Sequence, residues 1–243
     1  MTNEKNTGAR AHRYAAYFAP AADSPWWRAG SEWLGRSATI GGGLLAQPPV
    51  EGVSADEQQR LTRAPRRYGW HATLRAPFAL AEGVSEADLR RRLRALCAGL
   101  QPFELPPLRV ARLDDFLALR PEGGSAQADA VAAACVQGLQ ELAAPLSEAD
   151  LARRRAAGLS PREDELLLRW GYPYVLERFR FHLSLTGTLE GSAPALADAL
   201  EAAAMRHFAA LPPCRFESVA LFAEPQPGAD MLRIVDVPLG DTK

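Results

Sequence analysis

Cysteine is scarce in this sequence. The three cysteines, Cys97, Cys135 and Cys214, are widely separated, and no two of them form a C-x-x-C pair. An odd number of isolated cysteines excludes a disulfide framework, and the spacing argues against a structural zinc site. Each cysteine has apolar neighbours in sequence, so we expect three buried, reduced thiols, as is usual for a cytoplasmic protein.

Long apolar runs are also missing. No segment approaches the roughly 20 apolar residues that a membrane-spanning helix needs, and the Ala-rich stretch 126–146 is interrupted by Gln, Gly and Glu. The N-terminal residues MTNEKNTGARAH are polar and lack the apolar core of a secretion signal. The sequence therefore predicts a soluble, cytoplasmic protein without a membrane partner.

Neither sign of charge is in excess. The 28 Lys and Arg residues nearly balance the 29 Asp and Glu residues, and the formal net charge is −1. This balance excludes a protein-wide positive field that would hold a long nucleic acid. A local cluster must therefore bind any anionic ligand, which favours a small phosphorylated molecule or a nucleic-acid end. All basic residues except Lys5 and Lys243 are arginines. Arginine is the better bidentate partner for phosphate, although a GC-rich genome explains the same bias.

Several common catalytic motifs are absent as well. The sequence contains no G-x-G-x-x-G, no G-x-x-x-x-G-K-[ST], no H-E-x-x-H and no G-x-S-x-G pattern. Dinucleotide, P-loop, zinc-protease and α/β-hydrolase sites are therefore poorly supported. The sequence also offers no carboxylate cluster for a metal ion. We expect neither a metal nor another cofactor.

Hydrophobic periodicity predicts a mixed α+β protein. Residues 1–12 are predicted to form a disordered N-terminal tail, and residues 13–243 a single domain. Predicted strands cover residues 13–18, 67–74, 103–112, 116–120, 178–186, 216–223 and 231–237. Predicted helices cover residues 26–34, 55–63, 85–100, 128–142 and 195–211, and two helix starts lie in a segment at about 145–174.

The two halves of the chain correspond. HATLRAPFALAEG followed by a helix matches HLSLTGTLEG followed by a helix, and each match continues into a strand, a turn and a strand. This pattern predicts an internal duplication, with repeats at about 13–112 and 113–240 and an insertion at about 145–174. We expect a pseudo-twofold, bilobal α+β fold with two antiparallel sheets lining a central groove.

A histidine–hydroxyl pattern occurs once in each repeat. His71-x-Thr73-Leu and His182-x-Ser184-Leu share the same spacing, and residues two apart on a strand face the same way. Each repeat thus presents one imidazole and one hydroxyl to the groove. A histidine in an apolar strand is more often a hydrogen-bonded core residue, but two of only four histidines carry this pattern.

Paired histidines suit the cleavage of a phosphodiester. His71 and His182 are the candidate catalytic residues, because two imidazoles that titrate near pH 7 can act as general base and general acid. Thr73 and Ser184 are the candidate phosphate-binding residues, because their hydroxyls can donate to the non-bridging oxygens. This chemistry requires no metal.

Three arginines are further candidates for substrate binding. Arg75 lies four residues after His71 and Arg67 four residues before it, so on a continuous strand they share a face. Arg180 has the same parity as His182. Strand arginines at a surface are common, so each of them is as readily explained by exposure to solvent.

Tyr17 is the remaining candidate for substrate binding. Tyr14 and Tyr17 lie on opposite faces of the first predicted strand, so at most one of them points to the groove. In the insertion, the run 153–155 consists of three arginines. It is either a solvated helix face, the more common reading of a charge run, or a lid over an anionic ligand.

Paired His-x-[ST] strands in duplicated halves resemble the two-histidine phosphoesterase superfamily. A longer resemblance, to the DUF1045 family, covers the chain from Arg13 onward. It rests on RYAAYFAP, WWRAGSEWLGR, YGWHATLRAPF, FELPPLRVARL, PLSEADLARRRAAGLSPREDELLLRWGYPYV and FRFHLSLTG. The family carries a phosphonate-metabolism label, because its genes occur with carbon–phosphorus lyase clusters. Members commonly have Lys where this sequence has Arg75, so the positive charge is kept.

The sequence therefore predicts a metal-independent phosphoesterase, a phosphoric diester hydrolase. The resemblance implies a small cyclic phosphodiester as substrate, such as a sugar phosphate from phosphonate breakdown. One alternative is an RNA-end or 2′–5′ phosphodiesterase or ligase of the same superfamily. Another is a non-catalytic regulator that binds a nucleotide or phosphate. We expect a monomer that has a small phosphorylated partner and does not bind long nucleic acids.

Overall fold

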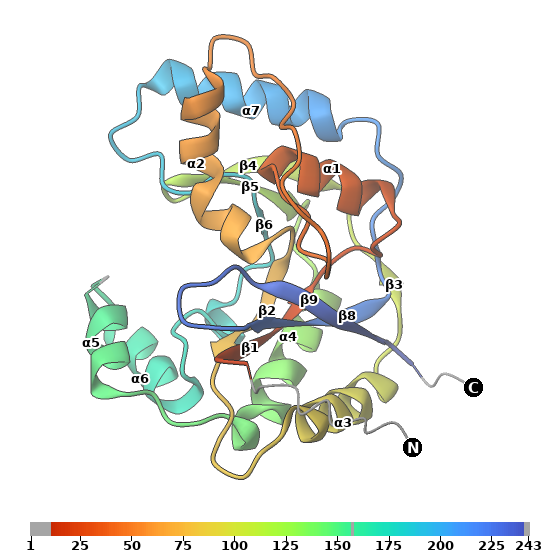
Figure 1. Cartoon of the computed structure of the whole chain (residues 1–243), viewed down its shortest axis with the longest axis vertical. Coiled ribbons are helices and arrows are strands. Elements are labelled where there is room, and N and C mark those ends of the chain that lie inside the picture. Colours follow the sequence, from red (N-terminus) through yellow and green to blue (C-terminus); the bar gives the residue numbers. More distant parts are fainter. Residues whose placement is uncertain (1–10, 157, 241–243) are drawn as a thin grey trace, which may run out of the picture.

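The computed structural model describes residues 11–156 and 158–240, and it is an α+β protein with antiparallel sheets (Figure 1). The strands are β1 Arg13–Phe18, β2 Ala72–Phe78, β3 Phe103–Glu104, β4 Leu108–Leu113, β5 Phe116–Pro121, β6 Leu183–Ser184, β7 Arg215–Phe216, β8 Ser218–Glu224 and β9 Leu232–Pro238. The helices are α1 Pro25–Leu34, α2 Ala55–Tyr68, α3 Glu86–Ala98, α4 Ala126–Gly138, α5 Glu148–Arg155, α6 Pro161–Trp170 and α7 Pro194–Phe208. Short 3₁₀ turns lie at Gln140–Leu142 and Leu176–Arg178.

Two sheets draw their strands from distant parts of the chain. One has four strands in the order β2-β1-β8-β9, and the other has three in the order β4-β5-β6. Strands β3 and β7 form a small separate pair. In the larger sheet, β1 lies between β2 and β8, so the chain's two ends meet there. The strand that follows His71 therefore pairs with an N-terminal strand, and the strand that follows His182 pairs with β5.

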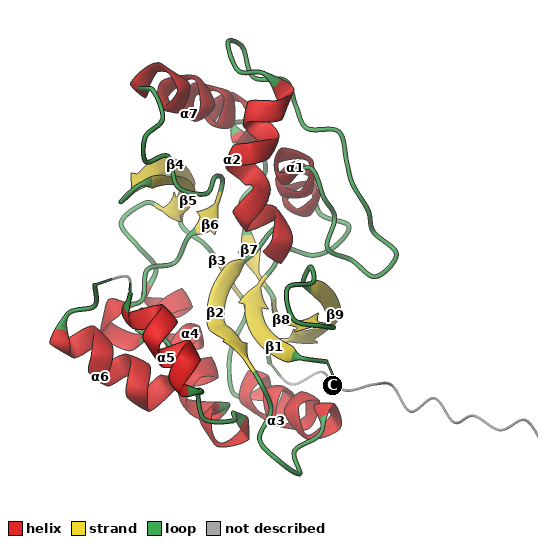
Figure 2. Ribbon diagram, turned by 60° about the vertical axis from the view of Figure 1, so that its left-hand side comes forward, coloured by secondary structure: helices red, strands yellow, loops and turns green. Residues whose placement is uncertain are grey.

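The helices gather toward the two ends of the molecule. Figures 1 and 2 show α1, α2 and α7 beside the three-stranded sheet at one end, and α3 to α6 at the other. The four-stranded sheet lies between these groups. Its central strands, β1 and β8, are almost fully buried, and the five residues from Tyr14 to Phe18 are each at most 1% exposed. This central sheet is the rigid element on which the first histidine is placed.

Local sequence rules account for most helix ends. Ser85 caps α3 and forms a reciprocal capping box with Asp88, and Ser160 does the same for α6 with Glu163. Helix α1 ends at Gly35, whose φ of 77° is left-handed and favours glycine. Ser147 likewise caps α5, so both helix starts predicted in the insertion are confirmed. The three cysteines are free and buried, as predicted.

The predicted strand 67–74 is wrong in its first half. Helix α2 continues to Tyr68, and the paired strand begins only at Ala72. Pro65, inside the helix, has no N–H to donate to the carbonyl of Leu61, so a helix that continues past this residue lacks one of its own hydrogen bonds. In the structure the N–H of Gly187 donates to that carbonyl at 2.6 Å instead. A distant segment supplies the missing hydrogen bond, which no local pattern could indicate.

Two other predicted strands are shorter than expected. Only Leu183–Ser184 of the predicted strand 178–186 pairs with a neighbour, and a 3₁₀ turn occupies Leu176–Arg178. The predicted strand 103–112 is divided into β3 and β4, because the two consecutive prolines between them cannot donate to a ladder. Of the predicted tail, residues 1–10 lie outside the described residues, whereas the N–H of His12 donates to the carbonyl of Glu224 at 2.8 Å.

The described helices include none that is long and apolar enough to cross a bilayer. This agrees with the absence of long apolar runs from the sequence.

Helix α1 packs directly on the residue that precedes His71. A Cβ atom added to Gly30 would lie 2.0 Å from the Trp70 ring, which is fully buried. No side chain larger than hydrogen fits between the helix and this indole. The contact fixes Trp70 and, through the chain, the start of β2.

We expect Gly30→Ala to destabilise the protein although alanine is the better helix former. Overpacking costs about 1–3 kcal/mol and outweighs the roughly 1 kcal/mol that alanine gains in a helix. Gly43→Ala is the matched control, since a Cβ there meets nothing within 4 Å. Urea unfolding of both variants checks this. Equal stability of the two variants would show that the Trp70 contact is not tight.

Candidate functional site

A single cavity of about 1100 Å³ brings both histidine–hydroxyl pairs together. His71, Thr73, His182 and Ser184 all line it. It also draws on the end of α2, on the loop after β2 and on the insertion that carries α5 and α6. The sequence pattern placed these four side chains in one groove, and the structure does so too.

His71 is held in place on three sides. Its Nδ1 atom lies 2.8 Å from the carbonyl oxygen of Gly69, and its Nε2 atom lies 3.2 Å from Oγ1 of Thr73. The ring of Tyr17 stacks on the imidazole, with 3.9 Å between the centroids. Ala72 and Leu74 are buried on the opposite face. Strand periodicity therefore sorts this segment into a core face and a cavity face, as the sequence indicates.

His182 repeats the same local arrangement. Its Nδ1 atom lies 2.7 Å from the carbonyl oxygen of Arg180, again the residue two positions earlier. The ring lies 5.5 Å from that of Phe116 on β5. Leu183 and Leu185 are fully buried, whereas Ser184 shares the cavity face. Although this segment is barely a strand, it places the imidazole and the hydroxyl as the first motif does.

Both imidazoles are neutral at neutral pH. A carbonyl oxygen only accepts hydrogen bonds, so Nδ1 carries the proton in each ring and Nε2 is an acceptor. Burial lowers the pKa of His71 to about 4, and the nearby His182 lowers it further. Burial also lowers the pKa of His182. The expectation that both histidines titrate near pH 7 is therefore wrong for His71, because the surrounding side chains displace the water that would stabilise the charged ring.

The candidate arginines divide between the cavity and the surface. Arg75 lines the cavity but is buried, with its guanidinium donating to the carbonyl of Val136 at 3.2 Å and to Oε1 of Gln140 at 2.7 Å. Arg67 also lines it, from the end of α2 rather than from a strand. Arg180 lies outside the cavity lining and forms an exposed ion pair with Asp114 at 2.9 Å.

Of the two tyrosines on β1, Tyr17 faces the cavity. It pairs with Thr73 in the sheet register and lies among the lining residues. Tyr14 points to the other face, where its hydroxyl donates to Glu86 at 2.9 Å. Burial raises the pKa of Tyr17 well above its usual value, so the phenol is neutral.

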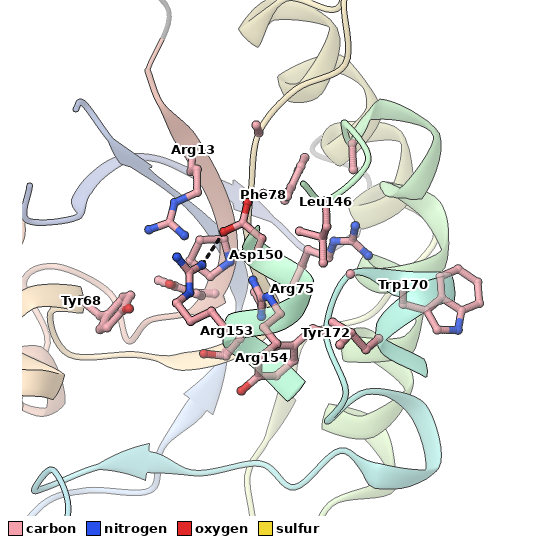
Figure 3. Close-up of a pocket in the computed structure, with 18 of the residues that line it drawn as sticks. Arg13, Tyr68, Arg75, Phe78, Leu146, Asp150, Arg153, Arg154, Trp170 and Tyr172 are labelled. Carbon is pink, nitrogen blue, oxygen red and sulfur yellow. Dashed lines mark hydrogen bonds and ion pairs between the residues drawn. The ribbon is translucent and has the colours of Figure 1, made fainter. Parts of the chain in front are cut away.

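Sequence reasoning did not select several residues that surround the cavity. Figure 3 shows Arg13, Tyr68, Arg153, Arg154 and Tyr172 around the same space. The Arg run was noticed, but helical spacing alone could not indicate which of its side chains turns inward. Arg13 begins the first strand and had no motif to mark it.

Glu224, which does not itself line the cavity, holds two of the arginines that do. Its side chain is fully buried at the end of β8 and forms ion pairs with Arg13, at 2.5 Å, and with Arg67. The N–H of Gly228 donates to it at 2.9 Å. Burial alone would raise the pKa of Glu224, but these hydrogen bonds and charges hold it below the usual value. The carboxylate therefore stays ionised and aligns two arginines at the cavity wall.

Within the described ranges, no group of three or more His, Cys, Asp or Glu side chains is arranged to hold a metal ion. Asp150 is the one acidic side chain among the described residues that line the cavity. Five arginines line it: Arg13, Arg67, Arg75, Arg153 and Arg154. The cavity is therefore positive although the chain's net charge is −1, and arginines of this kind suit phosphate.

Comparison with known proteins assigns the family. Residues 73–232 match the family described as "Protein of unknown function (DUF1045)". The chain belongs to the DUF1045 family. This confirms the longer of the two resemblances drawn from the sequence, whereas the relation to the two-histidine phosphoesterases is not itself shown.

Two curated bacterial proteins are similar over almost the whole chain. The "Ribose 1,5-bisphosphate phosphokinase PhnN" of Janthinobacterium sp. (strain Marseille) is 41% identical over 229 residues, which are 93% of this chain and 50% of the relative. The protein of the same name from Laribacter hongkongensis (strain HLHK9) is 46% identical over 218 residues, 89% of this chain and 49% of the relative. The chain thus spans about half the length of these relatives.

These names contradict the predicted reaction. A phosphokinase transfers a phosphoryl group, whereas the sequence was interpreted as that of a phosphoric diester hydrolase acting on a small cyclic phosphodiester. The hydrolase prediction is therefore wrong.

The first prediction from this site concerns pH and stability. His71 has a folded-state pKa of about 4, and about 6.5 is expected for the unfolded chain. Between these values the unfolded state binds a proton that the folded state does not, so stability is complete above pH 6.5 and falls as the pH drops toward 4. From pH 7 to 5 the loss should be about 2 kcal/mol, measured by urea unfolding. The His71→Gln protein has no such group, so its unfolding free energy should fall by about 2 kcal/mol less over this pH range. An identical pH profile for the two proteins would contradict the low pKa of His71.

The second prediction concerns Glu224. Replacing it by Gln removes the charge that two arginines share in a buried position, so we expect a loss of about 1.5–3 kcal/mol in unfolding free energy. Asp114→Asn is the matched control, because its ion pair with Arg180 is exposed and worth at most about 1 kcal/mol. Chemical denaturation at pH 7 compares the two. Equal losses would mean that the Glu224 cluster is no stronger than a surface pair.

Proposed function

We propose that this chain binds a phosphorylated ribose in the cavity, as the sugar-phosphate-binding part of a ribose 1,5-bisphosphate phosphokinase. The observation that carries this proposal is the composition of one cavity. The neutral imidazoles of His71 and His182 line it together with His12 and five arginines, with a single carboxylate among its described residues. Such a cavity suits a ligand that offers hydroxyl groups as well as phosphates.

The histidines favour the sugar rather than a phosphate. The Nδ1 atom of each ring is engaged by a backbone carbonyl, so Nε2 is the nitrogen left to meet a ligand, and in His71 it shares that role with the Thr73 hydroxyl 3.2 Å away. An unprotonated nitrogen accepts a hydrogen bond, and a phosphate dianion has no hydrogen to donate. Sugar hydroxyls do. Thr73 and Ser184 add hydroxyls that both donate and accept, which suits the alternating donors and acceptors of a pentose.

The arginines favour the phosphates. Guanidinium groups bind phosphate oxygens in bidentate fashion. Glu224 already engages Arg13 and Arg67, yet each guanidinium has five N–H donors, so further donors remain for a ligand. The name of the two relatives suggests the identity of the sugar and the number of its phosphates.

We assign binding, and not phosphoryl transfer, to this chain alone. It spans about half of the relatives' length, and its sequence has no G-x-x-x-x-G-K-[ST] pattern to hold the phosphates of a nucleotide. Within the longer relatives, the reaction therefore draws on residues beyond those that this chain matches. The setting in phosphonate metabolism, which the family resemblance implies, fits a phosphorylated ribose as ligand.

We further infer common ancestry with the two-histidine phosphoesterases, with the bilobal, duplicated fold that this entails. Two shared features support this inference. Each His-x-[ST] motif leads into a strand with an antiparallel partner, and in each motif the histidine Nδ1 atom is hydrogen-bonded to the carbonyl two residues earlier. Hydrolysis does not come with the ancestry. The small phosphorylated partner, the monomeric state and the cytoplasmic location remain part of this proposal.

Isothermal titration calorimetry of the 243-residue chain tests the function. Ribose 1,5-bisphosphate should bind, and ribose without phosphate should not, because the arginines supply most of the attraction. His182→Ala should weaken binding about tenfold, since one hydrogen bond is worth about 1 kcal/mol or slightly more. Arg180→Gln is the matched control, because Arg180 lies on the same segment but outside the cavity.

Two results would overturn this proposal. The first is the absence of binding by the wild-type chain, or an equal loss in the His182→Ala and Arg180→Gln proteins. The second concerns the division of roles: phosphorylation of the bisphosphate by this chain alone, with a nucleoside triphosphate and Mg²⁺, would show that it is a complete kinase.

A further inference from the structure

Arg154 differs from the two arginines beside it on α5. Arg153 is exposed and forms an ion pair with Asp150 at 2.6 Å. Arg155 is also exposed and binds Asp164 with two hydrogen bonds, at 2.6 and 3.0 Å. Arg154 has no carboxylate within ion-pair distance in the described part of the chain, and it is only partly exposed. Arg153 and Arg155 are thus each paired with a carboxylate, and Arg154 between them is not.

The side chain of Arg154 turns into the cavity. It lies among the lining residues, and its guanidinium sits over the ring of Tyr172 at 5.5 Å (Figure 3). Its Nε atom is buried and has no hydrogen-bond partner among the described residues. A buried donor without a partner is costly unless a ligand satisfies it. Helix α5 thus brings an unsatisfied cation to the cavity.

Arg75 presents a second charge to the same region. It is only 3% exposed, and the two groups that accept its hydrogen bonds, the carbonyl of Val136 and Oε1 of Gln140, are neutral. No carboxylate lies within ion-pair distance of it in residues 11–156 and 158–240. Burial, together with the like charge of Arg154, lowers the pKa of Arg75 to about 10. It remains charged at neutral pH, so Arg75 and Arg154 are two cations that repel each other.

This pair lies away from the histidines. Arg75 and His71 are four residues apart on or beside β2, which corresponds to roughly 13 Å along an extended strand. Arg154 comes from α5 in the insertion, a different element of the cavity lining from those that hold the two histidines. One phosphate group is too small to span both ends. A ligand held at the histidines therefore meets the two arginines only with a second, distal group.

We propose that Arg154 and Arg75 form a second phosphate subsite, which selects a bisphosphorylated sugar over the monophosphate. The inference rests on the proposed function and extends it, because it assigns the far end of the ligand to named residues. Tyr172 supports the Arg154 guanidinium from one side and leaves its edge for the phosphate oxygens. The insertion then supplies, through Arg154, the contact that distinguishes a ligand with two phosphates from a ligand with one.

Calorimetric titration of four proteins with two ligands tests this. The ligands are ribose 5-phosphate and the bisphosphate used above, and the proteins are wild type, Arg154→Gln, Arg154→Lys and Arg155→Gln. Wild type should bind the bisphosphate at least tenfold more tightly than the monophosphate. Arg154→Gln should lose most of that preference while its affinity for the monophosphate changes less than twofold, and Arg154→Lys should fall between. Arg155→Gln, on the same helix, should match wild type.

Thermal melting without ligand distinguishes a binding role from a structural one. Removal of an unpaired cation should leave the melting temperature of Arg154→Gln unchanged or raise it, whereas a structural arginine would lower it. Wild type that binds both ligands equally would overturn the subsite and leave the proposed function standing. An equal loss for both ligands in Arg154→Gln would also overturn it. If wild type binds neither ligand, both proposals fall.

Discussion

The C-terminal end of helix α2 is the constraint on which the site depends. Two sets of polar contacts hold this helix end in place. Arg36 donates to the carbonyls of Arg66 and Arg67, at 3.1 and 3.4 Å, while Glu224 pairs with the side chain of Arg67. The chain leaves this anchored end through Gly69, whose φ of 80° favours glycine, and reaches His71 two residues later. Because Gly69 also accepts from His71, the same short segment fixes the position and the tautomer of the imidazole.

The second histidine depends on the first half of the molecule. The N–H of Gly187 completes the hydrogen bonding of α2 at Leu61, next to the helix proline. The carbonyl of Leu185 accepts a hydrogen bond from the indole of Trp33 in α1, at 2.9 Å. The short segment after His182 is thus held by helices rather than by a long strand ladder. The two motifs are alike in sequence and in local geometry, yet different neighbours hold them.

Structural features that depend only on neighbouring residues could be predicted from the sequence. The strand at Arg13–Phe18, the serine-capped helices and the alternation around His71 follow from periodicity and capping chemistry, and all are present. The end of α2 could not be predicted, because its continuation past Pro65 relies on a partner more than a hundred residues away. The protonation of the histidines was missed for the same kind of reason. Their charge depends on burial by Tyr17 and other distant residues, which the motif does not contain.

The interleaving of the larger sheet has a consequence for how the chain acquires its structure. Strand β1 pairs with β8, about two hundred positions later, and with β2 on its other side. During synthesis the first strand must therefore wait until nearly the whole chain has left the ribosome before its ladder is complete. Contacts so distant in sequence are slow to form, and partly folded chains expose an unpaired edge meanwhile. Either half of the molecule, excised from the chain, would lack strands that complete both larger sheets.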